Sequence, residues 1–179
     1  MVRILVISDT HIQRSEDMPT QILEIAKHAD MVIHAGDVTR DSVLLGFEKN
    51  CEVVAVRGNM DAQPVSSRFP AKTRLDAEGV RIGVVHGFGA PDHVAYIARN
   101  MFEDVDIIIF GHSHQFYLES LEGVTMMNPG SPTDPRRAPF PSYGWIEING
   151  AHYKAELFAL NGELERSEER RVGEEGRSR

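Results

Sequence analysis

Apolar runs that alternate with polar, turn-rich stretches divide the first half of the chain into strands and helices. Val2–Ile7 is a nearly continuous apolar run rich in β-branched residues, which predicts a buried strand. Pro19–Ala29 gathers its apolar side chains on one stripe, with proline in the first turn, which predicts a helix. Met31–His34 and Val53–Val56 are predicted to be strands. Between them, Asp41–Glu48 is predicted to be a short helix with Asp41 as its N-cap. This alternation predicts parallel strands joined by right-handed crossovers.

The second half of the chain is richer in strands. Val80–Val85 and Ile107–Phe110 predict buried strands, separated by a helix from about Asp92 to Phe102. Shorter strands are predicted at Phe116–Glu119, Val124–Met127, Trp145–Ile148 and Tyr153–Phe158. The sequences Glu122-Gly123 and Asn149-Gly150 are typical of hairpin turns. An α/β half followed by an antiparallel half predicts two packed mixed sheets flanked by helices.

With 179 residues, the chain is long enough for one domain with a sizeable core and short for two. We place this domain at residues 1–160. From Asn161 to Arg179 the sequence is heavily charged and has almost no apolar side chains. This composition predicts a flexible or partly helical C-terminal tail.

The composition is that of an ordinary globular protein, with 41% hydrophobic and 26% charged residues. No apolar run approaches the roughly 18 residues that cross a bilayer, and the N-terminal residues lack the order of features in a signal peptide. The single cysteine, Cys51, cannot form an internal disulfide, so nothing requires an oxidising compartment. We therefore expect a cytoplasmic protein that does not bind membranes.

The charge balance narrows the choice of partners. With 19 basic and 27 acidic residues, the formal net charge is −8. An acidic surface repels the phosphate backbone, so we expect no stable binding of duplex nucleic acid. A small phosphorylated substrate is still compatible, because two bound dications would reverse the sign of the local field.

Five short polar motifs each follow an apolar strand. They are Asp9-Thr10-His11, Gly36-Asp37, Gly58-Asn59, His86-Gly87 and Gly111-His112-Ser113-His114. Ligand sites in open α/β sheets gather outside the carboxyl ends of the strands, so all five motifs should meet at one edge of the molecule. Taken alone, each motif has an ordinary structural explanation. A lone aspartate can cap a turn, Gly-Asp or Gly-Asn can form a turn, and a lone histidine is usually hydrogen-bonded. Their joint occurrence in this order favours a common site.

The residue types in these motifs suit divalent metal ions. Carboxylate and amide oxygens combined with imidazole nitrogens suit Mn²⁺, Fe²⁺, Co²⁺, Ni²⁺ or Zn²⁺. Residues i and i+2 of an extended chain face the same way, so Asp9 can act with His11, and His112 with His114. Seven ligands are too many for one ion and suit two. Such a pair, about 3.5–4 Å apart, would activate a water as a hydroxide for in-line attack on phosphorus and offset phosphoryl charge.

In this order, the motifs resemble those of the calcineurin-like metallophosphoesterase superfamily, over the chain from Val2 to Phe158. The stretches Val56–Asp61 and Asn128–Ser131 are similar to those of small YfcE-type phosphodiesterases of bacteria and archaea. The resemblance implies a four-layer α/β/β/α sandwich. It also implies that the protein is a hydrolase with a binuclear metal centre.

The resemblance further implies how the ligands are divided. The first metal would be held by Asp9, His11, Asp37 and His114. The second would be held by Asp37, Asn59, His86 and His112, with Asp37 as the bridge. Asp37, Asn59 and His86 would surround the catalytic hydroxide, and His34 and Asp61 would orient the ligands from behind, with Arg57 as a weaker candidate for that role. We expect Mn²⁺, with Ni²⁺, Co²⁺, Fe²⁺, Zn²⁺ or Mg²⁺ as alternatives.

One position departs from the pattern of many phosphomonoesterases in the superfamily. They have a histidine directly after Gly-Asn that acts as the general acid, whereas this chain has Met60. Losing a positioned acid typically costs about 10²–10⁴-fold in rate, most for poor leaving groups. We therefore expect a phosphodiesterase for substrates with good leaving groups, with nucleotides and cyclic nucleotides as open choices. A homodimer or higher oligomer is compatible with the resemblance.

Two other functions compete with this interpretation. The superfamily includes a scaffold subunit of retromer that keeps the fold, has lost key ligands and docks other proteins. The complete ligand set, including His11 and Asn59, argues against a catalytically weak scaffold here. The other alternative is a related metal enzyme, such as a nuclease or a nucleotide pyrophosphatase, which would share the mechanism and change only the substrate.

Overall fold

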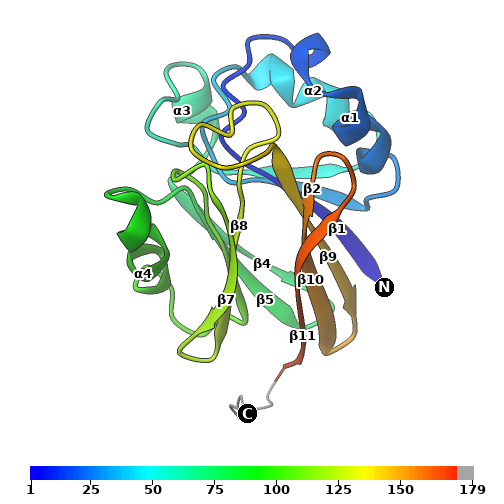
Figure 1. Ribbon diagram of the computed structural model, residues 1–179, viewed down its shortest axis with the longest axis vertical. Helices are drawn as coiled ribbons and strands as arrows, with labels where there is room; N and C mark the ends of the chain where they lie inside the picture. The colour runs from blue at the N-terminus through cyan, green and yellow to red at the C-terminus, as the bar shows by residue number, and fades with distance from the viewer. Residues whose placement is uncertain (173–179) are drawn as a thin grey trace.

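The computed structural model describes residues 1–172, which form two β-sheets packed face to face (Figure 1). The first sheet contains, in spatial order, β11 (Leu164–Arg171), β10 (His152–Ala159), β9 (Ser142–Asn149), β1 (Val2–Ile7), β2 (Met31–His34) and β3 (Glu52–Ala55). The second contains β4 (Lys72–Ala77), β5 (Val80–Val85), β6 (Ile107–Ile109), β8 (Val124–Pro129) and β7 (Phe116–Leu121). Both sheets are mixed, since β1, β2 and β3 run parallel, as do β5, β6 and β8, while the remaining pairs are antiparallel.

The main hydrophobic core lies between the two sheets. Ile4 and Val6 of β1 belong to the same buried cluster as Ile82 of β5 and Ile107 of β6. The alternate β1 residue Leu5 belongs to a second cluster together with residues of the helices on that side. Both faces of β1 are therefore buried, which explains its nearly continuous apolar sequence.

Short helices cover the outer face of each sheet. On the first sheet lie α1 (Thr20–Ala26) and α2 (Leu45–Glu48), and on the second lies α4 (Val94–Arg99) (Figure 1). The remaining short helices are α3 (Val65–Arg68), η1 (Ser15–Asp17), η2 (Asp41–Val43) and η3 (Pro91–His93). The predicted arrangement of two mixed sheets flanked by helices is confirmed.

Several local predictions differ from the structure. Residues 41–48 form a 3-10 turn followed by α2, and Arg40, not Asp41, precedes the turn, without a side-chain capping bond. The helix predicted from Asp92 is shorter, because Pro91–His93 forms a 3-10 turn before α4. Strand β4 and helix α3 were not predicted.

The largest difference between prediction and structure lies in the charged C-terminal segment. Leu164–Arg171 forms the edge strand β11, paired antiparallel with β10, so the expectation of a flexible or partly helical tail is wrong for these residues. Backbone pairing holds this strand, and its outer side chains are charged, a common way to protect a sheet edge. Residues 173–179 of the predicted tail lie outside the described part of the chain. Within residues 1–172, no helix has the length and apolar character of a membrane span.

Candidate metal centre

The five polar motifs meet at the carboxyl ends of parallel strands from both sheets. Asp9 and His11 follow β1, Asp37 follows β2, and Asn59 follows β3, while His86 follows β5, and His112 and His114 follow β6. Backbone bonds fix the neighbouring turns, from Asp9 N to Gly36 O at 3.0 Å and from His11 N to Asp37 O at 3.2 Å. The two sheets are joined at this point by His112 N, which donates to Asp9 Oδ2 at 3.0 Å.

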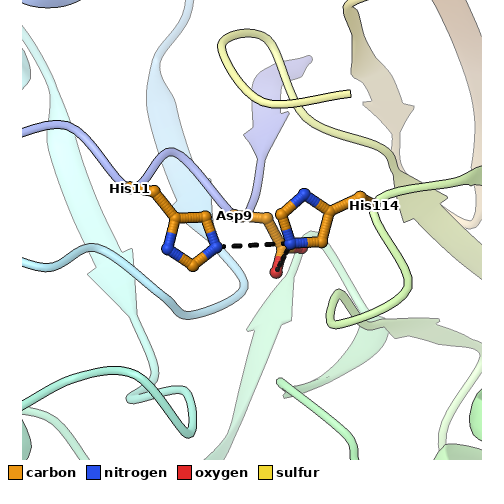
Figure 2. A group of neighbouring side chains, drawn as sticks. All are labelled: Asp9, His11 and His114. Carbon is orange, nitrogen blue, oxygen red and sulfur yellow. Dashed lines mark hydrogen bonds and ion pairs between the residues drawn. The ribbon is translucent and has the colours of Figure 1, made fainter. Parts of the chain in front are cut away.

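Asp9, His11 and His114 form a first group of converging ligand atoms (Figure 2). His114 Nε2 lies 3.4 Å from Asp9 Oδ1 and 3.3 Å from His11 Nε2. These residues come from the ends of β1 and β6, one in each sheet. The first group therefore depends on how the two sheets pack.

A second group gathers around Asp37 and His86. His86 Nε2 lies 3.4 Å from Asp37 Oδ2, 3.8 Å from Asp9 Oδ1 and 3.1 Å from Asn59 Oδ1. His112 Nδ1 lies 2.9 Å from the same Asn59 oxygen. All the ligands predicted from the motifs are thus brought together.

Two carboxylates connect the groups. Asp9 belongs to both of the Asp/His groups that could hold an ion. Asp37 Oδ2 lies 3.5 Å from His11 Nε2 and 3.4 Å from His86 Nε2, and so stands between the two groups. This position fits the bridging role expected for Asp37, although the division of ligands between two ions stays a prediction.

Backbone carbonyls orient three of the imidazoles. His86 Nδ1 lies 2.7 Å from Ala35 O, His114 Nδ1 lies 2.5 Å from Asp134 O, and His112 Nε2 lies 3.1 Å from Gly89 O. A carbonyl only accepts, so each of these nitrogens carries the hydrogen and the opposite nitrogen presents its lone pair. In all three rings the opposite nitrogen faces the centre, an orientation that metal-ligating histidines commonly have.

The chemistry of these donors fits divalent cations. Asp9 Oδ2 accepts from Ser8 Oγ at 2.7 Å, whereas the buried Asp9 Oδ1 accepts no hydrogen bond from residues 1–172. An unsatisfied buried carboxylate oxygen is costly, and a bound cation would satisfy it. The unsatisfied Asp9 oxygen therefore supports a cation at this centre.

The pKa values reflect the burial of these groups. Burial raises the pKa of the Asp9 carboxyl to about 7, against the opposing influence of His86 and Ser8. Burial lowers the pKa values of His11 and His114. Burial alone would raise the pKa of Asp37 and lower that of His86, but the interaction between these two side chains outweighs it, so the pKa of Asp37 is lowered and that of His86 is raised. The centre can therefore exchange protons for metal ions near neutral pH.

His34 and Asp61 lie behind the ligands, as expected from the sequence. His34 is fully buried; its Nδ1 accepts from Gly36 N at 3.2 Å and its Nε2 lies 3.0 Å from Thr10 Oγ1. Burial lowers the pKa of His34 to about 3, so it is a neutral link between the β1 and β2 turns. Asp61 accepts from Thr39 N at 2.7 Å and from Gly58 N at 2.8 Å. Arg57 instead binds Ser66 O, away from the ligands.

The backbone of the site carries unusual conformations. Positive φ angles of 49° to 71° occur at five candidate ligands: Asp9, His11, Asp37, His112 and His114. Such left-handed angles in non-glycine residues are costly and gather at functional sites. At Gly58, an added Cβ would collide with Asp37 Oδ1, so only glycine allows this close approach.

The loop after β8 contains contacts that sequence reasoning missed. Ser131 Oγ donates to Asp9 O at 2.8 Å, and Thr133 Oγ1 donates to Thr10 O at 2.6 Å. Asp134 supplies the carbonyl that orients His114. The similarity of the Asn128–Ser131 stretch to YfcE-type proteins was the one sequence signal that pointed to this loop.

Comparison with known proteins agrees with this geometry. Residues 2–151 match the model of the calcineurin-like phosphoesterase superfamily domain. The chain belongs to the calcineurin-like phosphoesterase superfamily. A probable metallophosphoesterase of Methanothermobacter thermautotrophicus is 32% identical over 167 residues, which cover 90% of this chain and 95% of that protein. The family expected from the five motifs is confirmed.

Solved structures share the fold of this calcineurin-like phosphoesterase. Wild-type Vps29 from Entamoeba histolytica, complexed with Zn²⁺, matches with a TM-score of 0.73 and 24% identity, covering 94% of this chain and 98% of that one. YfcE, a phosphoesterase from E. coli, matches with a TM-score of 0.69 and 21% identity, covering 92% and 97%. At these identities the likeness establishes the common fold.

Proposed function

We propose that this protein hydrolyses phosphodiester bonds in small substrates, using two divalent cations held by Asp9, His11, Asp37, Asn59, His86, His112 and His114. The observation that carries the proposal is the convergence of these side chains, from both sheets, on a centre in which acceptor atoms face one another. Pairs of divalent cations at such centres activate water and offset the charge that develops on a phosphoryl group.

The protein's own residues would prepare this centre in three ways. Asp9 and Asp37 supply the negative charge that holds cations, and Asp9, whose pKa is raised to about 7 by burial, must release its proton to do so. The carbonyls of Ala35, Gly89 and Asp134 keep the three imidazoles in one tautomer. The backbone N–H of Met60 donates to Asp37 Oδ1 at 2.8 Å, which leaves Oδ2 to face the histidines.

Met60 supports a preference for diesters with good leaving groups. Its backbone lies against Asp37, and its side chain is 59% exposed beside the centre. A thioether cannot give a proton to the departing oxygen. The leaving group must then depart as an anion, which favours aryl oxides and phosphates over serine or threonine alkoxides.

Hydrolysis of matched esters tests this proposal. The protein loaded with Mn²⁺, and in parallel with Ni²⁺, Co²⁺, Zn²⁺ or Mg²⁺, is assayed with bis(p-nitrophenyl) phosphate, p-nitrophenyl phosphate and a phosphoserine peptide. We expect the highest kcat/KM for the aryl diester. Faster turnover of the phosphoserine peptide would contradict the diester preference. Cyclic nucleotides, dinucleotides and single-stranded DNA then separate a nucleotide phosphodiesterase from a nuclease.

A protein-binding scaffold is the second candidate function. The observation in its favour is the common fold with Vps29, a vacuolar protein sorting-associated protein that has been solved in complex with Zn²⁺, so bound metal alone does not distinguish the two functions. Only activity distinguishes them. A protein that binds metal but hydrolyses none of these esters with any of the ions would favour the scaffold.

A further inference from the structure

A guanidinium group lies beside the first group of ligands. Arg136 belongs to the loop after β8, and its Nε donates to Asp134 Oδ2 at 3.2 Å. The same carboxylate oxygen lies 3.7 Å from His114 Nδ1, the ring nitrogen opposite the one that faces the centre, so Arg136 lies at the outer side of this candidate ligand. The Arg136 side chain is 52% exposed, which leaves it accessible to a substrate.

The loop is fixed to the centre, so the position of Arg136 is defined. Ser131 and Thr133 bind the backbone of the β1 turn, and Asp134 O binds His114. Arg136 itself has a φ of 48°, a left-handed conformation that is unusual for arginine.

The terminal nitrogens of Arg136 are available to a ligand. The bond of Arg136 to Asp134 uses Nε, and within residues 1–172 the two terminal guanidinium nitrogens of Arg136 make no hydrogen bond. These nitrogens form a planar fork that matches two oxygens of a phosphate group.

We propose that Arg136 binds a non-bridging oxygen of the substrate's phosphate group and thereby selects anionic phosphodiesters over neutral phosphotriesters. This inference rests on the proposed function, because it assigns a phosphate-binding residue to the same centre. The ion pair with Asp134 holds the guanidinium in place before the substrate arrives. Arg136 is thus a substrate-binding residue, whereas Asp134 is a positioning residue.

Three variants test the inference: Arg136→Gln, Arg136→Lys and, as the control, Arg137→Gln in the same loop. Binding of inorganic phosphate to the Mn²⁺-loaded proteins is measured by isothermal titration calorimetry, with bound metal and melting temperature measured in parallel. We expect Arg136→Gln to weaken phosphate binding about tenfold or more, since a charge-assisted hydrogen bond is lost. Metal content and melting temperature should stay the same, because an exposed ion pair contributes little stability.

The other readouts separate binding from a structural role. Arg136→Gln should raise KM for bis(p-nitrophenyl) phosphate much more than it lowers kcat, and should leave hydrolysis of a neutral aryl phosphotriester unchanged. Arg136→Lys should be intermediate, since it keeps the charge and loses the fork. Arg137→Gln should bind phosphate like the unaltered protein.

Unchanged phosphate affinity in Arg136→Gln would overturn the inference, as would an equal loss in Arg137→Gln or no phosphate binding by the unaltered protein. Failure of the proposed function gives a different result. A protein that binds phosphate through Arg136 but hydrolyses no diester would contradict the proposed function and support only the assignment of Arg136 as a phosphate-binding residue.

Discussion

The Nε2 atoms of His11 and His114 lie 3.3 Å apart, with their rings stacked at an interplanar angle of 7°. His114 donates through Nδ1 to Asp134 O, so its Nε2 points toward His11 as an acceptor. Asp9 Oδ1 lies 3.4 Å from the same nitrogen and accepts no hydrogen bond from the described residues. A proton shared by the two Nε2 atoms would satisfy only the contact between the two rings. A cation would satisfy both nitrogens and Asp9 Oδ1 together.

Asp37→Asn should remove most metal binding and activity while the fold is kept. Asp37 Oδ2 faces histidines of both groups, and replacing one oxygen by an amide nitrogen removes charge needed by both. We expect metal affinity to fall at least about 100-fold, since even residues behind the ligands cost 10–100-fold when changed. Metal titration and circular dichroism measure the two effects, with Asp92→Asn, an exposed site, as the control. Wild-type rates at saturating metal would show that Asp37 does not bridge.

Asp9→Asn should stabilise the metal-free protein at pH 8. Burial raises the Asp9 pKa from 3.8 to about 7, so the folded state binds this proton more tightly than the unfolded state. The contribution of Asp9 to stability is therefore greatest below about pH 4 and is lost as the pH rises through 7. An amide carries no charge, and its nitrogen can donate to His114 Nε2.

Urea unfolding after removal of metal measures this effect. The gain of Asp9→Asn at pH 8 should be on the order of 3 kcal/mol, and it should shrink toward pH 4. Metal affinity should fall in the same variant. A metal-free Asp9→Asn protein that is less stable than the unaltered one at pH 8 would mean that the Asp9 carboxylate is not destabilising when charged.

Gly58→Ala should damage the centre through a single methyl group. The added Cβ would collide with Asp37 Oδ1 and the Asp37 backbone nitrogen, and therefore displace the Asn59 turn. Gly46→Ala in α2 is the matched control, because its Cβ would meet only ordinary contacts at 3.7 Å or more. We expect Gly58→Ala to lose metal affinity and Gly46→Ala to keep it, with a small gain in stability from helix propensity. Equal metal affinity in the two variants would contradict the close packing at Gly58.

Met60→His should shift the substrate preference toward poor leaving groups. An imidazole at this exposed position, next to Asn59, could give a proton to the departing oxygen. We expect the ratio of kcat/KM for a phosphoserine peptide to that for bis(p-nitrophenyl) phosphate to rise by about tenfold or more. Met60→Gln, which has similar size and no acidic proton, should leave the ratio unchanged. A similar rise in both variants would mean that polarity, and not proton donation, sets the preference.

The convergence of the motifs could be predicted because it follows from chain topology. Parallel strands end at the same edge of a sheet, so the polar residues that follow β1, β2 and β3 must meet at one edge of the first sheet, and those that follow β5 and β6 at one edge of the second. The joining of ligands from two sheets, such as Asp9 with His114, follows from the packing of the sheets through residues like Ile4 and Ile107. That packing was expected from the strand-rich second half.

Other features left little trace in the sequence. Strand β11 has exposed charged side chains in place of an apolar alternation, because it is held through its backbone to β10. The contact of the Asp134 carbonyl with His114 joins two residues that are 20 positions apart in the sequence, because the loop after β8 folds back toward the centre. Arg136 gains its position only through that loop. Local patterns of polarity do not record such long-range contacts.

The metal content of the purified protein tests the central claim most directly. The protein is loaded with Mn²⁺, freed of excess metal by desalting, and measured by inductively coupled plasma mass spectrometry against its concentration. The proposed centre predicts about two ions per chain, as in other two-metal phosphoesterase sites. A protein that retains no metal, or the same amount after Asp37→Asn, would contradict it.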